Sequence, residues 1–129
     1  VVAWFTGADN IATIKVAFSE DSGVTFGPAF QVDSGESVGR VGTLMLATGD
    51  ALISWVEWTS DGEVLMLCRA TKNDGCVARQ TITEHAASGS FNFPKLARSG
   101  DTIYLAWTQP IDSEAGFSTI RMVAFDLSD

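Results

Sequence analysis

The sequence is poor in several residue types, and each shortage excludes a class of protein. Eight lysines and arginines stand against sixteen aspartates and glutamates, a net charge of −8, so we expect no nucleic acid partner, because such binding needs clustered positive charge. No apolar run exceeds five residues, far short of the roughly 20 that span a membrane. His85 is the only histidine. It has no second histidine for a zinc site or a proton relay, so we interpret it as a loop residue and expect no metal and no cofactor.

Cysteine is equally scarce. Cys68 and Cys76 are the only two in the chain, and they flank a predicted turn. An even pair at this spacing suits a local disulfide formed in an oxidising compartment, and it also suits two buried free thiols. The sequence leaves both interpretations open.

The rest of the composition is that of a globular protein. Apolar residues make up 46% and charged residues 19% of the 129 residues, which is enough for one ordinary core. The chain opens with the apolar run Val1–Phe5, without an initiator methionine or a signal sequence. Because this run is typical of the middle of a strand, we expect the chain to be part of a longer protein, and any targeting segment would lie upstream of it.

The stretch from Ser19 to Phe26 has the pattern S-x-D-x-G-x-T-aromatic. Ser19 and Asp21 can accept hydrogen bonds from backbone N–H groups of a turn, and Gly23 can supply a positive φ. Thr25 completes the pattern, and Phe26 is expected to fold back as an apolar plug. These residues predict a structural turn, so we offer none of them as a catalyst or a metal ligand.

Three tryptophans mark an internal repeat. Trp4, Trp55 and Trp107 each end an apolar run, at spacings of 51 and 52 residues. A Gly-Asp pair precedes two of these runs, at Gly49-Asp50 and Gly100-Asp101, which are 51 residues apart. A fixed period of about fifty residues predicts one repeated structural unit.

The turn also recurs, in a degenerate form. Thr71 and Gly75 stand 52 positions after Ser19 and Gly23, but Asn73 replaces the aspartate and no aromatic follows. The second turn therefore keeps only the hydroxyl and the glycine of the first.

The repeat predicts ten short strands and no helix, because helical periodicity is absent. We call the four strands of one repeat A, B, C and D. Along the chain the predicted strands then follow in the order B-C-D, A-B-C-D and A-B-C. The predicted strands are A at Leu44–Ala47 and Lys95–Ala97, B at Val1–Trp4, Leu52–Trp55 and Ile103–Trp107, C at Ile14–Phe18, Leu65–Ala70 and Ile120–Phe125, and D at Ala29–Asp33 and Arg79–Thr83.

Several of these strands are apolar at consecutive positions, as in Val64–Cys68. Strands of this kind are buried on both faces, as in sheets stacked like the blades of a propeller. A two-layer sandwich would instead expose alternate residues, and it is the structural alternative.

The turn motif, the period and the line Pro94–Trp107 together resemble the sialidase-like (Asp-box, or BNR repeat) β-propellers, among them uncharacterised exported bacterial proteins. The resemblance implies an all-β fold in which the chain supplies about two and a half four-stranded antiparallel blades of a six-bladed ring. Residues 1–37 and 90–129 would form partial blades and residues 38–89 a complete one. The remaining blades, or another copy of the chain, would then be partners.

In this family, ligands bind on the face that carries the D-to-A and B-to-C loops, and the Asp-boxes lie on the opposite side. The resemblance therefore implies that Arg40, in the loop Ser34–Gly42, and Glu57, in the loop Glu57–Gly62, lie near a ligand. Trp58 beside Glu57 is an aromatic that can stack on a sugar ring. The alternative interpretation is a surface arginine, a strand-end glutamate and a packing tryptophan.

Sialidases use an arginine cluster, a tyrosine nucleophile with a glutamate, and an acidic residue. The chain has a single tyrosine, Tyr104, in a predicted strand where packing is expected. We therefore leave enzyme status open. The resemblance favours a secreted or periplasmic protein that binds a glycan or a small anion, with or without hydrolysis; the alternative is a non-catalytic scaffold for protein partners.

Overall fold

A computed structural model describes residues 1–83, 92–112 and 116–127. These residues form ten strands and one 3-10 turn, η1 (Ala8–Asn10), which confirms the predicted all-β class. The strands are β1 (Val2–Thr6), β2 (Thr13–Ala17), β3 (Phe30–Gln31), β4 (Ser37–Met45), β5 (Ala51–Thr59), β6 (Gly62–Thr71), β7 (Gly75–Thr81), β8 (Asn92–Ser99), β9 (Thr102–Asp112) and β10 (Phe117–Asp126).

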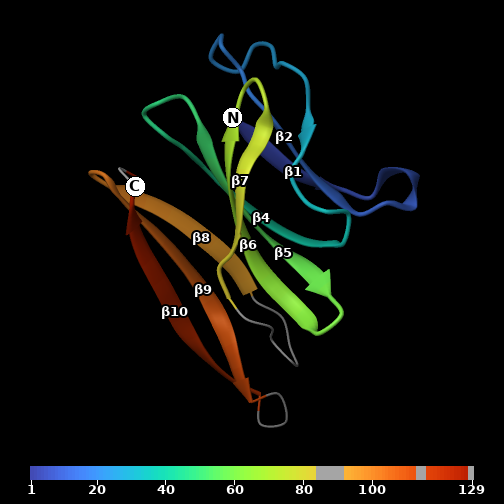
Figure 1. Cartoon of the computed structure of the whole chain (residues 1–129), viewed down its shortest axis with the longest axis vertical. Coiled ribbons are helices and arrows are strands. Elements are labelled where there is room, and N and C mark those ends of the chain that lie inside the picture. The colour runs from blue at the N-terminus through green and yellow to red at the C-terminus, as the bar shows by residue number, and fades with distance from the viewer. Residues whose placement is uncertain (84–91, 113–115, 128–129) are drawn as a thin grey trace.

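The strands form three antiparallel sheets, in the orders β1-β2-β3, β4-β5-β6-β7 and β10-β9-β8. In Figure 1 the four-stranded sheet lies between the two three-stranded sheets. Neighbouring strands in each sheet are also neighbours in the chain. No sheet closes on itself within the described part of the chain.

Two apolar cores hold the three sheets together, one on each face of the β4–β7 sheet. Ile53 and Trp55 of β5 contribute to the core shared with the first sheet, while Leu52 and Val56 contribute to the core shared with the third. Alternate residues of one strand thus point into different cores. Both faces of the central sheet are covered, which excludes a two-layer sandwich.

Strand β4 is longer than the sequence predicted. We expected a loop at Ser34–Gly42 and a strand only at Leu44–Ala47. The strand begins at Ser37, and its register shifts at Gly39 and Gly42. A Cβ on Gly42 would lie 2.7 Å from the Ser54 hydroxyl oxygen and 3.4 Å from the Pro94 carbonyl oxygen. Gly42 therefore marks close strand packing and not a loop.

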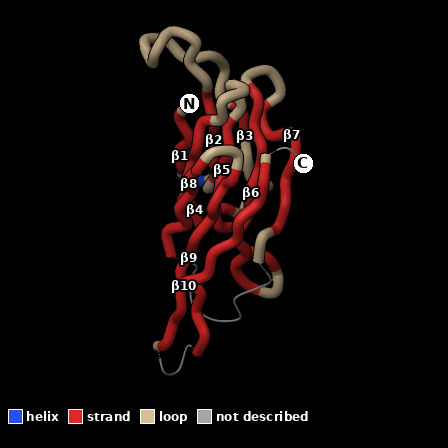
Figure 2. Tube along the Cα trace, turned by 90° about the vertical axis from the view of Figure 1, so that its left-hand side faces the viewer, coloured by secondary structure: helices blue, strands red, loops and turns tan. Residues whose placement is uncertain are grey.

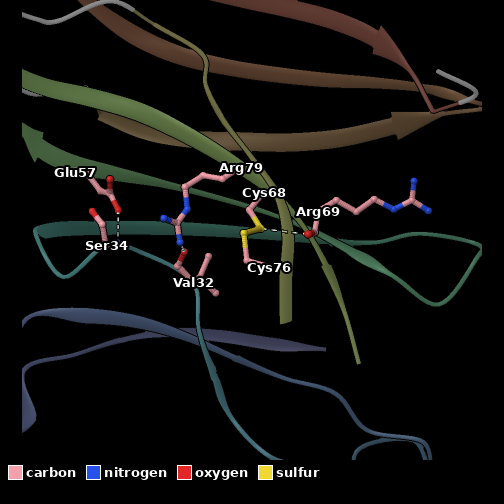
Figure 3. Close-up of a disulfide and its surroundings, with 7 residues drawn as sticks. All are labelled: Val32, Ser34, Glu57, Cys68, Arg69, Cys76 and Arg79. Carbon is pink, nitrogen blue, oxygen red and sulfur yellow. Dashed lines mark hydrogen bonds between the residues drawn. A yellow bond between two sulfur atoms is a disulfide. The ribbon is translucent and has the colours of Figure 1, made fainter. Parts of the chain in front are cut away.

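Cys68 and Cys76 form a disulfide, with their Cα atoms 5.9 Å apart, so the free-thiol alternative is excluded. The bond joins β6 to β7 beside the register shift between Arg69 and Ala70. Both cysteines pack into the core between the first and second sheets. Figure 3 also shows Cys68 Sγ 3.2 Å from the Arg69 carbonyl oxygen, a contact and not a hydrogen bond, because a disulfide sulfur carries no proton.

The third sheet has one covered and one open face. Ile120 and Met122 of β10 are 72% and 62% exposed, whereas Val123 and Phe125 of the same strand pack against the core shared with the second sheet. The uncovered face is therefore apolar at its centre.

No helix within the described ranges is both long enough and apolar enough to cross a membrane.

Replacing Gly75 tests the packing of the first sheet on the second. Gly75 has φ +67°, and a Cβ there would lie 2.7 Å from Phe30 Cβ, whereas Gly100 has φ +60° with no atom within 4 Å. Both alanine variants carry left-handed strain, but only Gly75→Ala adds a clash. We expect Gly75→Ala to lower the free energy of unfolding by about 1–3 kcal/mol more than Gly100→Ala, measured by chemical denaturation. Equal losses in the two variants would contradict the close packing.

Removing the disulfide tests its contribution to stability. The bond closes a loop with a sequence separation of 8, so the Cys68→Ala/Cys76→Ala variant should lose about 2 kcal/mol of unfolding free energy, through the greater entropy of its unfolded chain. A reductant should destabilise the wild type in urea melts and leave the double variant unchanged. Identical wild-type melts with and without reductant would show that the bond contributes nothing.

Candidate functional site

Strand pairing places the connections at two opposite ends of the sheets. The β3–β4 connection and the β5–β6 hairpin share one end, because Ser37 pairs with Glu57 and Thr59 with Gly62. The turn after β2 and the β6–β7 turn share the other end, where Lys72 bonds Glu20. Figure 2 shows the long connection after β2 extending beyond the strands. The predicted ligand residues and the Ser19–Phe26 turn thus lie at different ends.

Glu57 is a buried residue of β5 and not a loop residue, with 6% of its surface exposed. Its Oε1 accepts a hydrogen bond of 2.8 Å from the backbone N–H of Ser34, in the connection between β3 and β4 (Figure 3). A buried carboxylate needs such a donor. Glu57 therefore holds the segment that links the first sheet to the second.

Arg79 holds the same segment, and sequence reasoning missed it. From β7 its guanidinium donates to the backbone carbonyl of Val32 (Figure 3). The guanidinium also lies 5.9 Å from the centre of the buried Trp55 ring. The arginine thus links the outer strand of the second sheet to the end of the first. No sequence signal distinguished Arg79, because its partner is a backbone atom 47 positions away.

Arg40 lies within β4, where its φ of +55° places it in the left-handed region. It is partly buried, and its guanidinium lies 5.2 Å from the centre of the Phe93 ring of β8, a cation–π contact with the third sheet. The contact of Glu57 is with the connection from the first sheet. The two residues predicted as a pair therefore make their identified contacts with different sheets.

Trp58, the third predicted ligand residue, is 54% exposed near the end of β5. Its backbone N–H donates to the Glu36 carbonyl oxygen at 2.8 Å, and it pairs with Glu63 across the β5–β6 ladder. The indole is thus available to solvent at the same end as Glu57. His85 lies outside the described residues.

The Ser19–Phe26 turn has the hydrogen bonds that its sequence predicted. Ser19 Oγ accepts from the Gly23 N–H at 2.8 Å, and Asp21 Oδ1 accepts from the Thr25 N–H at 2.8 Å. Gly23 has a positive φ of +87°. The expectation for Phe26 was wrong. Its side chain is 48% exposed and is not a buried plug.

These bonds hold the pKa of Asp21 at about 2, below its ordinary value of 3.8. The largest cause is the hydrogen bond from the Thr25 hydroxyl, followed by the Thr25 N–H and the Ser19 hydroxyl. Each of these donors favours the charged carboxylate. The aspartate is thus fixed in its ionised form by the turn, which is a structural role.

The second, degenerate turn is held by a residue that we did not select when we aligned the two turns of the chain. The Thr71 hydroxyl oxygen accepts from the Asp74 N–H at 3.1 Å, and Thr71 Oγ1 donates to Asp74 Oδ2 at 3.3 Å. Asp74, and not Asn73, therefore takes the place of the aspartate. Asp74 lies one position after the residue that aligns with Asp21 at the 52-residue spacing, so an alignment by fixed spacing did not identify it.

A hollow of about 830 Å³ is an open groove between the second and third sheets at the Glu57 end. Trp107 and Arg121, paired across β9 and β10, lie in its wall. The Trp107 indole N–H donates to Gln109 Oε1 at 3.1 Å. The groove is lined by Ile82, Thr83, Trp107, Gln109, Pro110, Ile111, Arg121 and Met122.

Comparison with known proteins gave no match: no family profile, no curated protein and no solved structure is significantly similar to this chain. The described residues contain no group of three or more histidine, cysteine, aspartate or glutamate side chains that suits a metal ion.

The Asp21 carboxylate gives a test by pH titration. Because its pKa is about 2 in the folded chain and higher in the unfolded chain, its stabilising contribution is present above about pH 4 and is lost as the pH falls toward 2. In carboxyl-detected NMR, the Thr25→Val variant should have an Asp21 titration midpoint closer to 3.8. The substitution removes the Thr25 hydroxyl, whose hydrogen bond is the largest cause of the lowered pKa. Thr43→Val, on the exposed side of β4, serves as the control. A midpoint near 4 in the wild type would contradict the hydrogen-bonded turn.

Proposed function

We propose that this chain forms part of a sialidase-like β-propeller that binds a glycan or another small anionic ligand. The supporting observation is the stack of three antiparallel sheets, in which Trp55 and Trp107 occupy equivalent positions 52 residues apart and face equivalent cores. Successive four-stranded units that bury apolar faces against one another are typical of propeller blades. In this proposal the Ser19–Phe26 turn is an Asp-box.

The geometry favours binding over hydrolysis. Tyr104 lies in the middle of β9, paired with Ala97 and Ala124, so it is not presented from a loop as a nucleophile. Glu57 Oε1 is engaged by the Ser34 N–H. In this proposal we therefore do not assign these two residues as the tyrosine–glutamate pair that sialidases use.

A ligand would bind at the end that carries Ser34, Glu57 and Trp58. This end has an exposed indole and the open groove of about 830 Å³, a volume within the usual range of small-molecule sites, roughly 300–1,000 Å³. The disulfide supports a secreted or periplasmic location in this proposal, because such bonds persist in oxidising compartments.

A non-catalytic scaffold is the second candidate, and the open face of the third sheet favours it. Ile120 and Met122 are largely exposed on that face, and large exposed apolar patches mark protein interfaces. The partner would be further blades, another copy of the chain or a different protein. Light scattering of the purified chain tests this candidate: it predicts a discrete oligomer or a complex with an added partner.

The binding function is tested by NMR titration with sialyllactose, using neutral lactose as the matched control ligand. With sialyllactose we expect changes in the backbone amide chemical shifts at the end of the sheets that carries Ser34, Glu57 and Trp58. We expect no such changes at the Ser19–Phe26 turn. A fluorogenic sialic acid conjugate should show no turnover between about pH 4 and pH 8, a range that includes the pKa values of ordinary glutamate and histidine side chains. Equal responses to the two sugars would contradict anion binding, and turnover would make the protein a hydrolase.

A further inference from the structure

We propose that the groove between the second and third sheets is a binding site for a small organic carboxylate with a flat apolar body. The groove gathers one cation and two further hydrogen-bond donors beside an apolar wall, and no carboxylate belongs to its described lining. This site was not among the residues selected from the sequence. It stands on the geometry of the groove alone and does not depend on glycan binding.

Arg121 is the cation of the groove. It pairs with Trp107 across β9 and β10, and it lies on the same face of β10 as Val123 and Phe125, which pack toward the second sheet. Arg121 belongs to the lining of the groove. Within the described ranges, Arg121 has no ion pair, whereas Arg69 pairs with Asp50 and Arg98 with Asp101.

The other polar side chains of the groove are placed as donors. Gln109 Oε1 already accepts the Trp107 indole N–H at 3.1 Å, which orients the amide, and its Nε2 has only a long contact of 3.5 Å with the Pro110 carbonyl oxygen. Thr83 Oγ1 accepts the Leu65 N–H at 3.1 Å, so its own proton is available to donate. A ligand that meets these three groups must supply acceptors.

A single guanidinium suits a monoanion. Arginine binds a carboxylate through two parallel N–H···O bonds, and the described residues of the groove lining include no second cation to balance a doubly charged phosphate. Because the whole chain carries a net charge of −8, the long-range field repels anions, and affinity must come from these local donors. Binding should therefore depend on Arg121 itself and not on general attraction.

The apolar wall defines the body of the ligand. Ile82, Pro110 and Ile111 line the groove beside Arg121, and Ile111 is 66% exposed. A flat apolar ring would cover these side chains while its carboxylate reaches the guanidinium. The volume of about 830 Å³ leaves ample room for a single aromatic acid.

The test uses benzoate as the probe and benzamide as its neutral counterpart of nearly the same shape. We expect the wild-type chain to bind benzoate, detected by a shift of the Trp107 indole N–H resonance, and to bind benzamide more weakly. Arg121→Gln should weaken benzoate binding about tenfold or more, the cost of losing a charge-assisted hydrogen bond. Arg98→Gln, which makes the same substitution in β8 away from the groove, should bind as the wild type does.

Gln109→Glu provides a second variant. It keeps an oxygen to accept the Trp107 N–H but places a negative charge beside Arg121, so benzoate binding should be lost while the melting temperature changes little. Equal benzoate affinity in wild type and Arg121→Gln, or no benzoate binding by a wild-type chain that gives a folded spectrum, would overturn the proposal. Sialyllactose binding that survives Arg121→Gln would leave the proposed glycan function standing while locating it elsewhere.

Discussion

Burial of the central sheet on both faces is the constraint on which the other features depend. Since β5 and β6 are covered on each side, almost every residue of these strands must be apolar or must bring its own partner. Glu57 is an example: it enters this environment with 6% exposure and is satisfied by the Ser34 N–H. The same constraint explains the two glycines of β4, because a strand pressed between two neighbouring sheets has no room for side chains at every position.

The sequence was most informative where a residue type has one physical use. Tryptophans at a fixed spacing identified the repeating strands, and consecutive apolar residues in Val64–Cys68 indicated a sheet covered on both faces. Ser19, Asp21 and Gly23 form the turn that their side chains predicted, because all of its bonds are local. In each case the information lay within a few residues of the chain.

Where the sequence misled, the decisive contact came from a distant part of the chain. In a sequence, Gly39 and Gly42 indicate a loop. In the structure Phe5 packs closely against Gly39, and Ser54 and Pro94 pack closely against Gly42, so both glycines are strand residues. Arg40 and Glu57 were paired by their expected place in the family fold, and the contacts identified for them are with different sheets. Arg121 gave no signal at all, since an arginine without an acidic partner is recognised only once its neighbours in space are known.

The bond from Arg79 to the Val32 carbonyl oxygen has a consequence for the order of folding. Each sheet is assembled from hairpins that are local in sequence, so each can form early and at low entropic cost. The Val32 contact, however, needs β7 to be in place 47 residues further along. During synthesis the segment after β3 is therefore held first by its bond to β2 and by Glu57 of β5, and the Arg79 contact is added only when the outermost strand of the following sheet has formed.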